Sequence, residues 1–403
     1  MARFARFAAI ALLLSLSIFA FEGAIRLWRG GEWLLSSDVQ GAKHAVEILP
    51  TNPDARTRLA EMLWIAEQDE DHAADQFTRT LELDPYNCYG LLEFATLERG
   101  RMNLDHARQL LHAASDCDRF NPKFQQSVIT ELYVLGETNL ARVDLRRVLA
   151  TGPHFRDALI RVALSNESDI HHVLALLPAT QSAYEELLFI VIGKNDAGMI
   201  DDILVQGSTS GLRFTSRALL LAAEALLADQ RPYEAAAAWN TLVRSYSEFA
   251  GYAASPPNLV TNPTFALPIT GQGLDWHIST PSGVSITQSV PSGLTLSFHL
   301  AHLQGVSVFQ TIPALSNQRY SVSVEYDCSR LVSASPLQLV VTEVPGRQTL
   351  AQAVLDSSHT ELRSVVHTDA SATGITIAFI PTNPTALADG SLSLHSASVA
   401  ELR

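Results

Sequence analysis

The stretch AADQFTRTLELDP, residues 73–85, indicates how the first two thirds of this chain fold. Its Ala73, Phe77, Thr80 and Pro85 follow one another at spacings of four, three and five residues. Side chains four and three positions apart lie on one face of an α-helix. The small residue lets a partner helix approach, the large one fills the gap beside it, and the proline ends the helix. The stretch therefore predicts a short helix that packs against a neighbour and then stops.

This spacing recurs at intervals of about 34 residues, the period of one class of helical repeat. The other copies, complete or partial, are Ala42, Val46 and Leu49; Ala107, Leu111, Ala114 and the displaced Pro122; Ala141, Leu145, Val148 and Pro153; and Ala235, Trp239 and Leu242. The pattern resembles the second helix of a tetratricopeptide repeat over about residues 38–155, and it degenerates over 155–231, where helices are still expected. The resemblance implies an α-solenoid of helical hairpins over 36–250, with a protein partner on its surface.

Two cysteines fall at the ends of adjacent expected helices. Cys88 would open one helix and Cys117 would end the next, and these two ends meet in an antiparallel pair. If the chain is exported, a disulfide between them is one interpretation. Two independent buried thiols are the alternative.

The N-terminal segment, residues 1–30, has the pattern of a targeting signal. Arg3 and Arg6 precede an apolar run over residues 7–21 that Glu22 interrupts. A positive segment before such a run is typical of a signal anchor or a signal peptide. We expect an uncleaved anchor in an inner membrane, with the rest of the chain in the periplasm. The alternative is a cleaved signal peptide and release to the periplasm.

The composition changes at Gly251. Residues 251–257 read as a linker because of their Ser and Pro content, and residues 258–403 contain no lysine. Short runs of alternating apolar and polar residues follow, separated by turn residues, and they predict an antiparallel β-sandwich. The expected strands include residues 284–287, 294–298, 320–324, 337–341, 375–379 and 392–394. The fold class is thus multidomain α + β.

The C-terminal domain resembles the galactose-binding-like jelly rolls of carbohydrate-binding modules. The likeness is carried by residues 258–265, Asp275-Trp276, 308–312 with 317–322, and 391–399. It implies that the last strand returns beside the first.

The resemblance implies candidate ligand residues and one departure. Tyr326 and Trp276 are the candidate glycan contacts, because sugar rings stack on exposed aromatic faces, although Trp276 also suits the core, as Phe309 does. Ala266 stands where the family usually carries an acidic residue near a structural calcium, which puts calcium in doubt.

Several classes of function have no support in the sequence. A net charge of -14 with only Lys43, Lys123 and Lys194 as lysines argues against nucleic acid as a partner. No metalloprotease, nucleotide-loop or Cys-x-x-Cys motif is present, so no catalytic residue, metal or cofactor is expected. Residues 207–211 (GSTSG) read as a loop, and Asp201-Asp202 reads as a helix start, where carboxylates suit the helix dipole.

The architecture as a whole resembles bacterial envelope proteins linked to exopolysaccharide production or export. That likeness implies a non-enzymatic scaffold that contacts a protein partner through the helices. The alternative is a lectin-like protein that binds polysaccharide through the sandwich.

Overall fold

The computed structural model describes residues 32–33, 38–289, 293–333, 337–346 and 348–402. The chain divides into two compact units, Met1–Pro178 and Ala179–Arg403. None of the helices within these described ranges is long and apolar enough to cross a membrane. The expected signal anchor, residues 1–30, lies outside the described residues.

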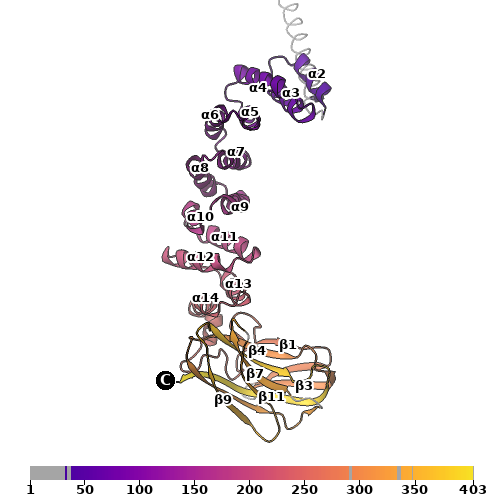
Figure 1. The fold of residues 1–403 in the computed structure, drawn as a ribbon, viewed down its shortest axis with the longest axis vertical. Coiled ribbons are helices and arrows are strands. Elements are labelled where there is room, and N and C mark those ends of the chain that lie inside the picture. The colour runs from indigo at the N-terminus through magenta and orange to yellow at the C-terminus, as the bar shows by residue number, and fades with distance from the viewer. Residues whose placement is uncertain (1–31, 34–37, 290–292, 334–336, 347, 403) are drawn as a thin grey trace, which may run out of the picture. The chain divides into compact units, whose positions relative to one another are not determined.

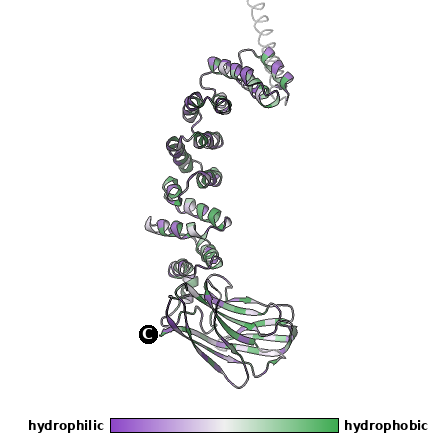
Figure 2. Cartoon of the chain, in the orientation of Figure 1, coloured by the Kyte–Doolittle hydropathy of each residue, from purple (hydrophilic) through white to green (hydrophobic). Residues whose placement is uncertain are grey.

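The first unit is an array of antiparallel helical hairpins (Figure 1). Its helices are α2 (Val39–Ile48), α3 (Pro53–Ala66), α4 (Glu70–Leu83), α5 (Cys88–Gly100), α6 (Leu104–Asp116), α7 (Pro122–Val134), α8 (Thr138–Thr151), α9 (Arg156–Asn166) and α10 (Ile170–Leu176), with a 3-10 turn, η1 (Pro153–Phe155). The helices carry both hydrophilic and hydrophobic residues rather than being apolar all round (Figure 2), as expected when one face is buried.

Side-chain caps begin many of these helices. Asn52 and Asn121 each stand before a proline and accept a hydrogen bond from the backbone NH three residues on, at 3.0 and 3.2 Å. Asn87 does the same for Gly90 at 2.7 Å. Asparagine at the N-cap satisfies an otherwise unpaired NH, and proline tolerates the first helical position because its missing NH would be unpaired there. These Asn-Pro pairs are therefore helix starts.

The repeated small and large residues form the contacts between helices. Ala73, Phe77 and Thr80 are fully buried on α4, and the corresponding residues of the later copies are buried as well. Those residues are Ala107, Leu111 and Ala114; Ala141, Leu145 and Val148; and Ala235, Trp239 and Leu242. The prediction of helical repeats is confirmed.

The turns between α3 and α4, between α5 and α6 and between α7 and α8 share a feature that the sequence does not reveal. Gln68, Met102 and Gly136 all have positive φ (54°, 63° and 77°), and they are one repeat length apart. Only Gly136 is the residue usually found in this conformation. The repeat therefore fixes the turn geometry even where the local residue type does not favour it.

The second unit begins with four helices and ends in the sandwich. The helices are α11 (Gln181–Gly193), α12 (Ala197–Thr209), α13 (Ser216–Ala228) and α14 (Pro232–Ser245), followed by a 3-10 helix, η2 (Ser247–Tyr252). The boundary between the two units thus falls inside the helical array, and the last hairpins group with the sandwich.

The sandwich consists of two antiparallel sheets (Figure 1). One sheet has the order β1-β4-β10-β7-β8 and the other has the order β2-β3-β11-β5-β9, with β6 paired to β11. The strands are β1 (His277–Ser279), β2 (Val284–Ser289), β3 (Gly293–His302), β4 (Ser307–Pro313), β5 (Arg319–Asp327), β6 (Val332–Ser333), β7 (Leu337–Val344), β8 (Thr349–Val354), β9 (Glu361–His367), β10 (Gly374–Pro381) and β11 (Leu387–Leu402). The predicted antiparallel sandwich is confirmed.

The segment that leads into the sandwich is held by buried polar side chains. Gln310 of β4 is fully buried and makes two bonds to Thr261, accepting from its NH at 2.9 Å and donating to its carbonyl at 3.0 Å. Asn258 bonds to Val399 and Ala397 of β11, and Leu259 donates to the Val399 carbonyl at 2.9 Å. The last strand therefore returns beside the opening segment, as the resemblance implies.

The last helical hairpin packs directly against the sandwich. Trp239 of α14 faces Gly273, Glu224 of α13 accepts a hydrogen bond from the Gly273 NH, and the Tyr252 hydroxyl donates to the Pro268 carbonyl at 2.6 Å. A terminal repeat must cover an apolar end that no further repeat covers. In the second unit the sandwich covers that end.

Candidate functional site

A disulfide stabilises one hairpin of the first unit. Cys88 begins α5 and Cys117 follows α6, and their sulfurs are bonded with the two Cα atoms 5.5 Å apart. This fixes the start of α5, where Tyr89 packs edge-on against Phe124 of α7 with ring centroids 5.2 Å apart. The disulfide therefore supports one end of a groove that α5 forms with α7.

That groove runs between α5 and α7 and has a volume of about 510 Å³. It is lined by Tyr89, Leu92, Glu93, Thr96, Lys123, Gln126, Ser127, Thr130 and Glu131, and we call it the α5–α7 groove. Tyr89 is 56% exposed, so its ring and hydroxyl are available to a ligand. All the lining residues except Leu92 carry an amide, hydroxyl or charged group, while most of the exposed lining surface is apolar, which suits an extended chain with both polar and apolar groups.

The charged side chains of the α5–α7 groove, which include Lys123, are only partly paired. Glu131 pairs with Arg99 at 2.8 Å, and nearby Glu61 pairs with Arg58 at 2.9 Å. Glu93 has no ion-pair partner among the described residues. Burial raises the pKa of Glu93, and the carboxylates of Glu61 and Glu131 raise it further. A cation placed beside Glu93 would stabilise its ionised form.

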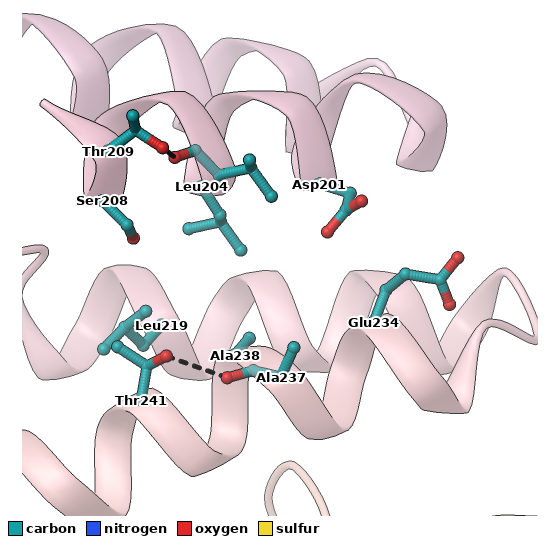
Figure 3. Close-up of a pocket in the computed structure, with 10 residues that line it drawn as sticks. Asp201, Leu204, Ser208, Thr209, Leu219, Glu234, Ala237, Ala238 and Thr241 are labelled. Atoms are coloured by element: carbon teal, nitrogen blue, oxygen red, sulfur yellow. Dashed lines mark hydrogen bonds between the residues drawn. The ribbon is translucent and has the colours of Figure 1, made fainter.

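A second hollow, of about 260 Å³, lies between α12, α13 and α14 in the second unit (Figure 3). Its lining consists of Asp201, Leu204, Val205, Ser208, Thr209, Leu219, Glu234, Ala237, Ala238 and Thr241, and we call it the α12–α14 slot. Apolar side chains lie in the middle, two carboxylates mark one end, and hydroxyls mark the other. The slot is thus amphipathic along its length.

Two sequence interpretations are corrected here. α12 begins at Ala197, so Asp201 and Asp202 lie in its second turn rather than at its start. The stretch read as a loop, residues 207–211, instead supplies the end of the helix, which continues through Thr209. Within this last turn Gly207 lets the Phe214 ring approach, to within 2.5 Å of where a Cβ would be. Ser208 and Thr209 consequently line the slot.

The interpretation of Tyr326 and Trp276 as glycan contacts is wrong for this structure. Tyr326 is 1% exposed, and its hydroxyl donates to the Asp356 carbonyl at 3.2 Å. Trp276 is fully buried, donates its indole NH to the Asn262 carbonyl at 3.1 Å, and packs 4.8 Å from Phe265. Their aromatic faces contribute to the core, so no sugar ring can reach them.

Phe309 lies outside the core, contrary to the sequence interpretation. Along β4 the side chains of Val308, Gln310 and Ile312 point inward. Because Gln310 is polar, the sequence of this strand does not show a regular alternation of apolar and polar residues. Phe309 stacks on His277 with ring centroids 5.0 Å apart. On its other side the paired residue is Ala378, which is too small to cover the ring.

A third hollow, of about 380 Å³, lies beside Phe309 and the turn between α13 and α14. Its walls include the hydroxyl residues Thr311, Thr342 and Thr376, together with Glu343. Glu343 is 2% exposed, and its Oε2 has no hydrogen-bond partner among the described residues. Burial raises the pKa of this carboxyl.

Within the described residues, no group of three or more His, Cys, Asp or Glu side chains is placed to hold a metal ion. Ala266 offers no carboxylate. Asp275, which is fully buried, accepts hydrogen bonds from the NH and the hydroxyl of Thr270 at 2.6 and 3.0 Å. Burial raises the pKa of Asp275 despite these bonds.

No protein-family model matches the sequence, and no curated protein matches it. Among solved structures, a carbohydrate-binding module described as CBM4 is 12% identical over 36% of this chain and 99% of its own, with a TM-score of 0.29. PilF of Pseudomonas aeruginosa is 17% identical over 57% of this chain and 93% of its own, with a TM-score of 0.28. YrrB, described as a tetratricopeptide protein with an unusual peptide-binding site, is 12% identical over 50% of this chain and 91% of its own, with a TM-score of 0.26. All three TM-scores are below 0.3, so these likenesses say nothing about what this protein binds.

Proposed function

We propose that this protein is a non-enzymatic scaffold whose helical array holds a segment of a protein partner in the α5–α7 groove. The observation that carries the proposal is the groove itself, with exposed Tyr89 at one end and Glu93, without an ion-pair partner among the described residues, one turn further along α5. A partly apolar groove between helices that carries a few polar and charged groups is one setting in which a peptide segment is recognised.

The dimensions of the groove suit an extended peptide. α5 and α7 contain 13 residues each and are therefore about 20 Å long. An extended chain advances about 3.3 Å per residue, so about six residues of a partner would span the groove. Gln126, Ser127 and Thr130 of α7 offer amide and hydroxyl groups to the backbone of such a segment.

The partner's side chain at Glu93 is expected to be lysine or arginine. Burial destabilises the ionised form of Glu93, and repulsion from the Glu61 and Glu131 carboxylates destabilises it further. The Arg99 guanidinium is paired with Glu131. A bidentate guanidinium or an ammonium group beside Glu93 would form a charge-assisted hydrogen bond, which is about twice as strong as a neutral one.

An envelope location belongs to the same proposal. A disulfide persists in an oxidising compartment, and the N-terminal pattern of residues 1–30 is that of an anchor or export signal. We therefore place the array outside the cytosol, held at an inner membrane or released to the periplasm. Assembly or export of exopolysaccharide is the process in which we place the scaffold.

Affinity capture tests the proposal. Tagged full-length protein and the double variant Tyr89→Ser, Glu93→Gln are purified from detergent-solubilised envelope of the native host. We expect one protein to copurify with the wild type and to be lost from the variant, while Glu248→Gln, which changes an exposed carboxylate on η2, retains it. Repeated recovery of the wild-type protein alone would contradict the scaffold function.

Glycan binding through the sandwich is the second candidate function. It is favoured by the hollow beside Phe309, where an aromatic ring open on the Ala378 side adjoins three threonines. Aromatic stacking with a few fixed polar groups is the usual chemistry of sugar sites.

A glycan array with the full-length protein tests this second function. We expect the signal to fall about five-fold in Phe309→Ala, since stacking is worth about 1 kcal/mol. The control Leu387→Ala changes an exposed apolar residue on the other sheet and should leave the signal unchanged. Absence of wild-type binding to every polysaccharide would rule the function out.

A further inference from the structure

The α12–α14 slot is hollow because one of its walls is made of methyl groups. Ala237 and Ala238 of α14 face it between Glu234 and Thr241, and a leucine at either position would fill the space (Figure 3). Opposite them, Leu204 is nearly buried, whereas Val205 remains 57% exposed beside the hollow. An apolar side chain entering the slot would bury this surface at about 25 cal/mol per Å².

The size of the slot limits what can occupy it. A volume of about 260 Å³ is below the range of about 300–1,000 Å³ that is typical of sites for whole small molecules and cofactors. One or two side chains of another protein fit this space better. The open shape between three helices likewise favours a segment of polypeptide.

The carboxylates at the end of the slot determine which charge the occupant carries. Asp201 of α12 and Glu234 of α14 face each other across this end (Figure 3). Glu234 is paired with Arg231 at 2.8 Å, whereas Asp201 has no ion-pair partner in the part of the chain that the structure describes. Burial raises the pKa of Asp201, the Glu234 and Asp202 charges raise it further, and Arg231 partly offsets them. The end of the slot therefore has an excess of negative charge in a half-buried place.

We infer that the α12–α14 slot is a second docking site for a protein segment that carries a lysine or arginine next to a small apolar residue. The cation lies between Asp201 and Glu234, and the apolar side chain lies over Ala237 and Ala238. This inference rests on the proposed scaffold function and adds to it a separate site, in the second unit, with its own side-chain preference.

The hydroxyl end of the slot completes the fit. Thr209 and Thr241 donate to the carbonyls of Val205 and Ala237 at 2.8 and 2.9 Å, so each hydroxyl oxygen keeps a free acceptor lone pair. Backbone NH groups of a bound segment can donate to these oxygens. The polarity of the slot thus orients the segment, with its cationic residue at Asp201 and its backbone at Thr241.

A positional-scanning peptide array tests the inference. Fluorescently labelled full-length protein is applied to 12-residue peptides in which each position is varied, and Ala237→Leu and the double variant Asp201→Asn, Glu234→Gln are compared with the wild type. Glu248→Gln is the matched control, because it removes an exposed carboxylate on η2 that does not line the slot.

The expected result has two parts. The wild type selects peptides with Lys or Arg beside a small apolar residue. The double variant Asp201→Asn, Glu234→Gln binds those peptides about ten-fold more weakly, as expected for the loss of a partly desolvated charge-assisted bond. Ala237→Leu binds the same peptides more weakly because the leucine occludes the slot. The double variant Tyr89→Ser, Glu93→Gln binds them as the wild type does.

Two failures are distinguishable. If peptides bind and only the Tyr89 and Glu93 variant weakens them, the α12–α14 slot is not a docking site but the scaffold function stands. If no peptide binds to any version of the protein, both the slot and the scaffold function are contradicted.

Discussion

The indole of Trp239 occupies the space in which a side chain at Gly273 would lie. A Cβ built on Gly273 would come within 2.5 Å of Cε3 and Cζ3 of the ring, and Gly273 also has a positive φ of 57°. Trp239 is the large residue of the last repeat, and Gly273 belongs to the segment that leads into the sandwich. The repeat motif thus forms one of the contacts by which the second unit joins its helices to its sandwich.

We predict that Gly273→Ala destabilises the protein by about 2–4 kcal/mol, the sum of a left-handed conformation for a residue with a side chain and of steric overlap with Trp239. Gly271→Ala is the matched control: its φ is 66°, but nothing lies within 4 Å of the added methyl group, so about 1 kcal/mol is expected. Denaturant unfolding measures both changes. Equal losses would show that the Trp239 contact contributes nothing.

The buried pair of hydrogen bonds between Gln310 and Thr261 leads to a second prediction. Gln310→Leu leaves the NH and carbonyl of Thr261 without their partners inside the sandwich, which should cost about 2–4 kcal/mol. Thr311→Val, one residue along and on the outer face, removes only a bond to Thr376 and should cost less than about 1 kcal/mol. Chemical denaturation distinguishes them, and a loss for Gln310→Leu no greater than for Thr311→Val would contradict the proposed role of Gln310.

The disulfide is tested by replacing both of its cysteines. Cys88→Ser, Cys117→Ser removes a cross-link between residues 29 positions apart and should lower stability by about 2–4 kcal/mol. Mass analysis under reducing and non-reducing conditions, with thermal unfolding, measures the effect. Cys328→Ser is the control, since that cysteine is buried without a disulfide. Two free thiols at Cys88 and Cys117 in the exported protein would contradict the pairing.

Asp275 predicts how stability depends on pH. Its pKa is raised in the fold by burial, so between the ordinary value of 3.8 and the raised value the folded state holds a proton that the unfolded chain has lost. The stabilising contribution is therefore full below the ordinary pKa and is lost as the pH rises through the raised one. We expect the unfolding free energy of wild type to fall relative to that of Asp275→Asn as the pH rises over this window. A difference that grows in the opposite direction would contradict the raised pKa.

Much of the fold could be predicted from periodicity. The spacing of Ala73, Phe77 and Thr80 identified helices whose contacts are made by those residues, and alternation identified the main strands. The positive φ of Gln68 and Met102 in the hairpin turns could not be predicted, because neither residue type favours it.

The candidate sites were harder to predict than the fold. Tyr326 and Trp276 remained candidate glycan contacts because no local pattern shows that both rings are buried with their polar atoms bonded to backbone carbonyls. Buried Gln310 makes Phe309 look like a core residue. The α5–α7 groove is formed by two helices with α6 between them in the sequence, and the lining of the α12–α14 slot is spread over three successive helices, so no local motif marks either site.

Site-specific photo-crosslinking at Tyr89 tests most directly whether the α5–α7 groove holds a protein partner. p-Benzoylphenylalanine replaces Tyr89 in the full-length protein in its native host, and a second strain carries it at Val143, an exposed residue of α8 outside the groove. We predict one discrete adduct with a single identified protein from position 89, abolished by Glu93→Gln and absent from position 143. No adduct at position 89, or the same adducts from both positions, would contradict the account.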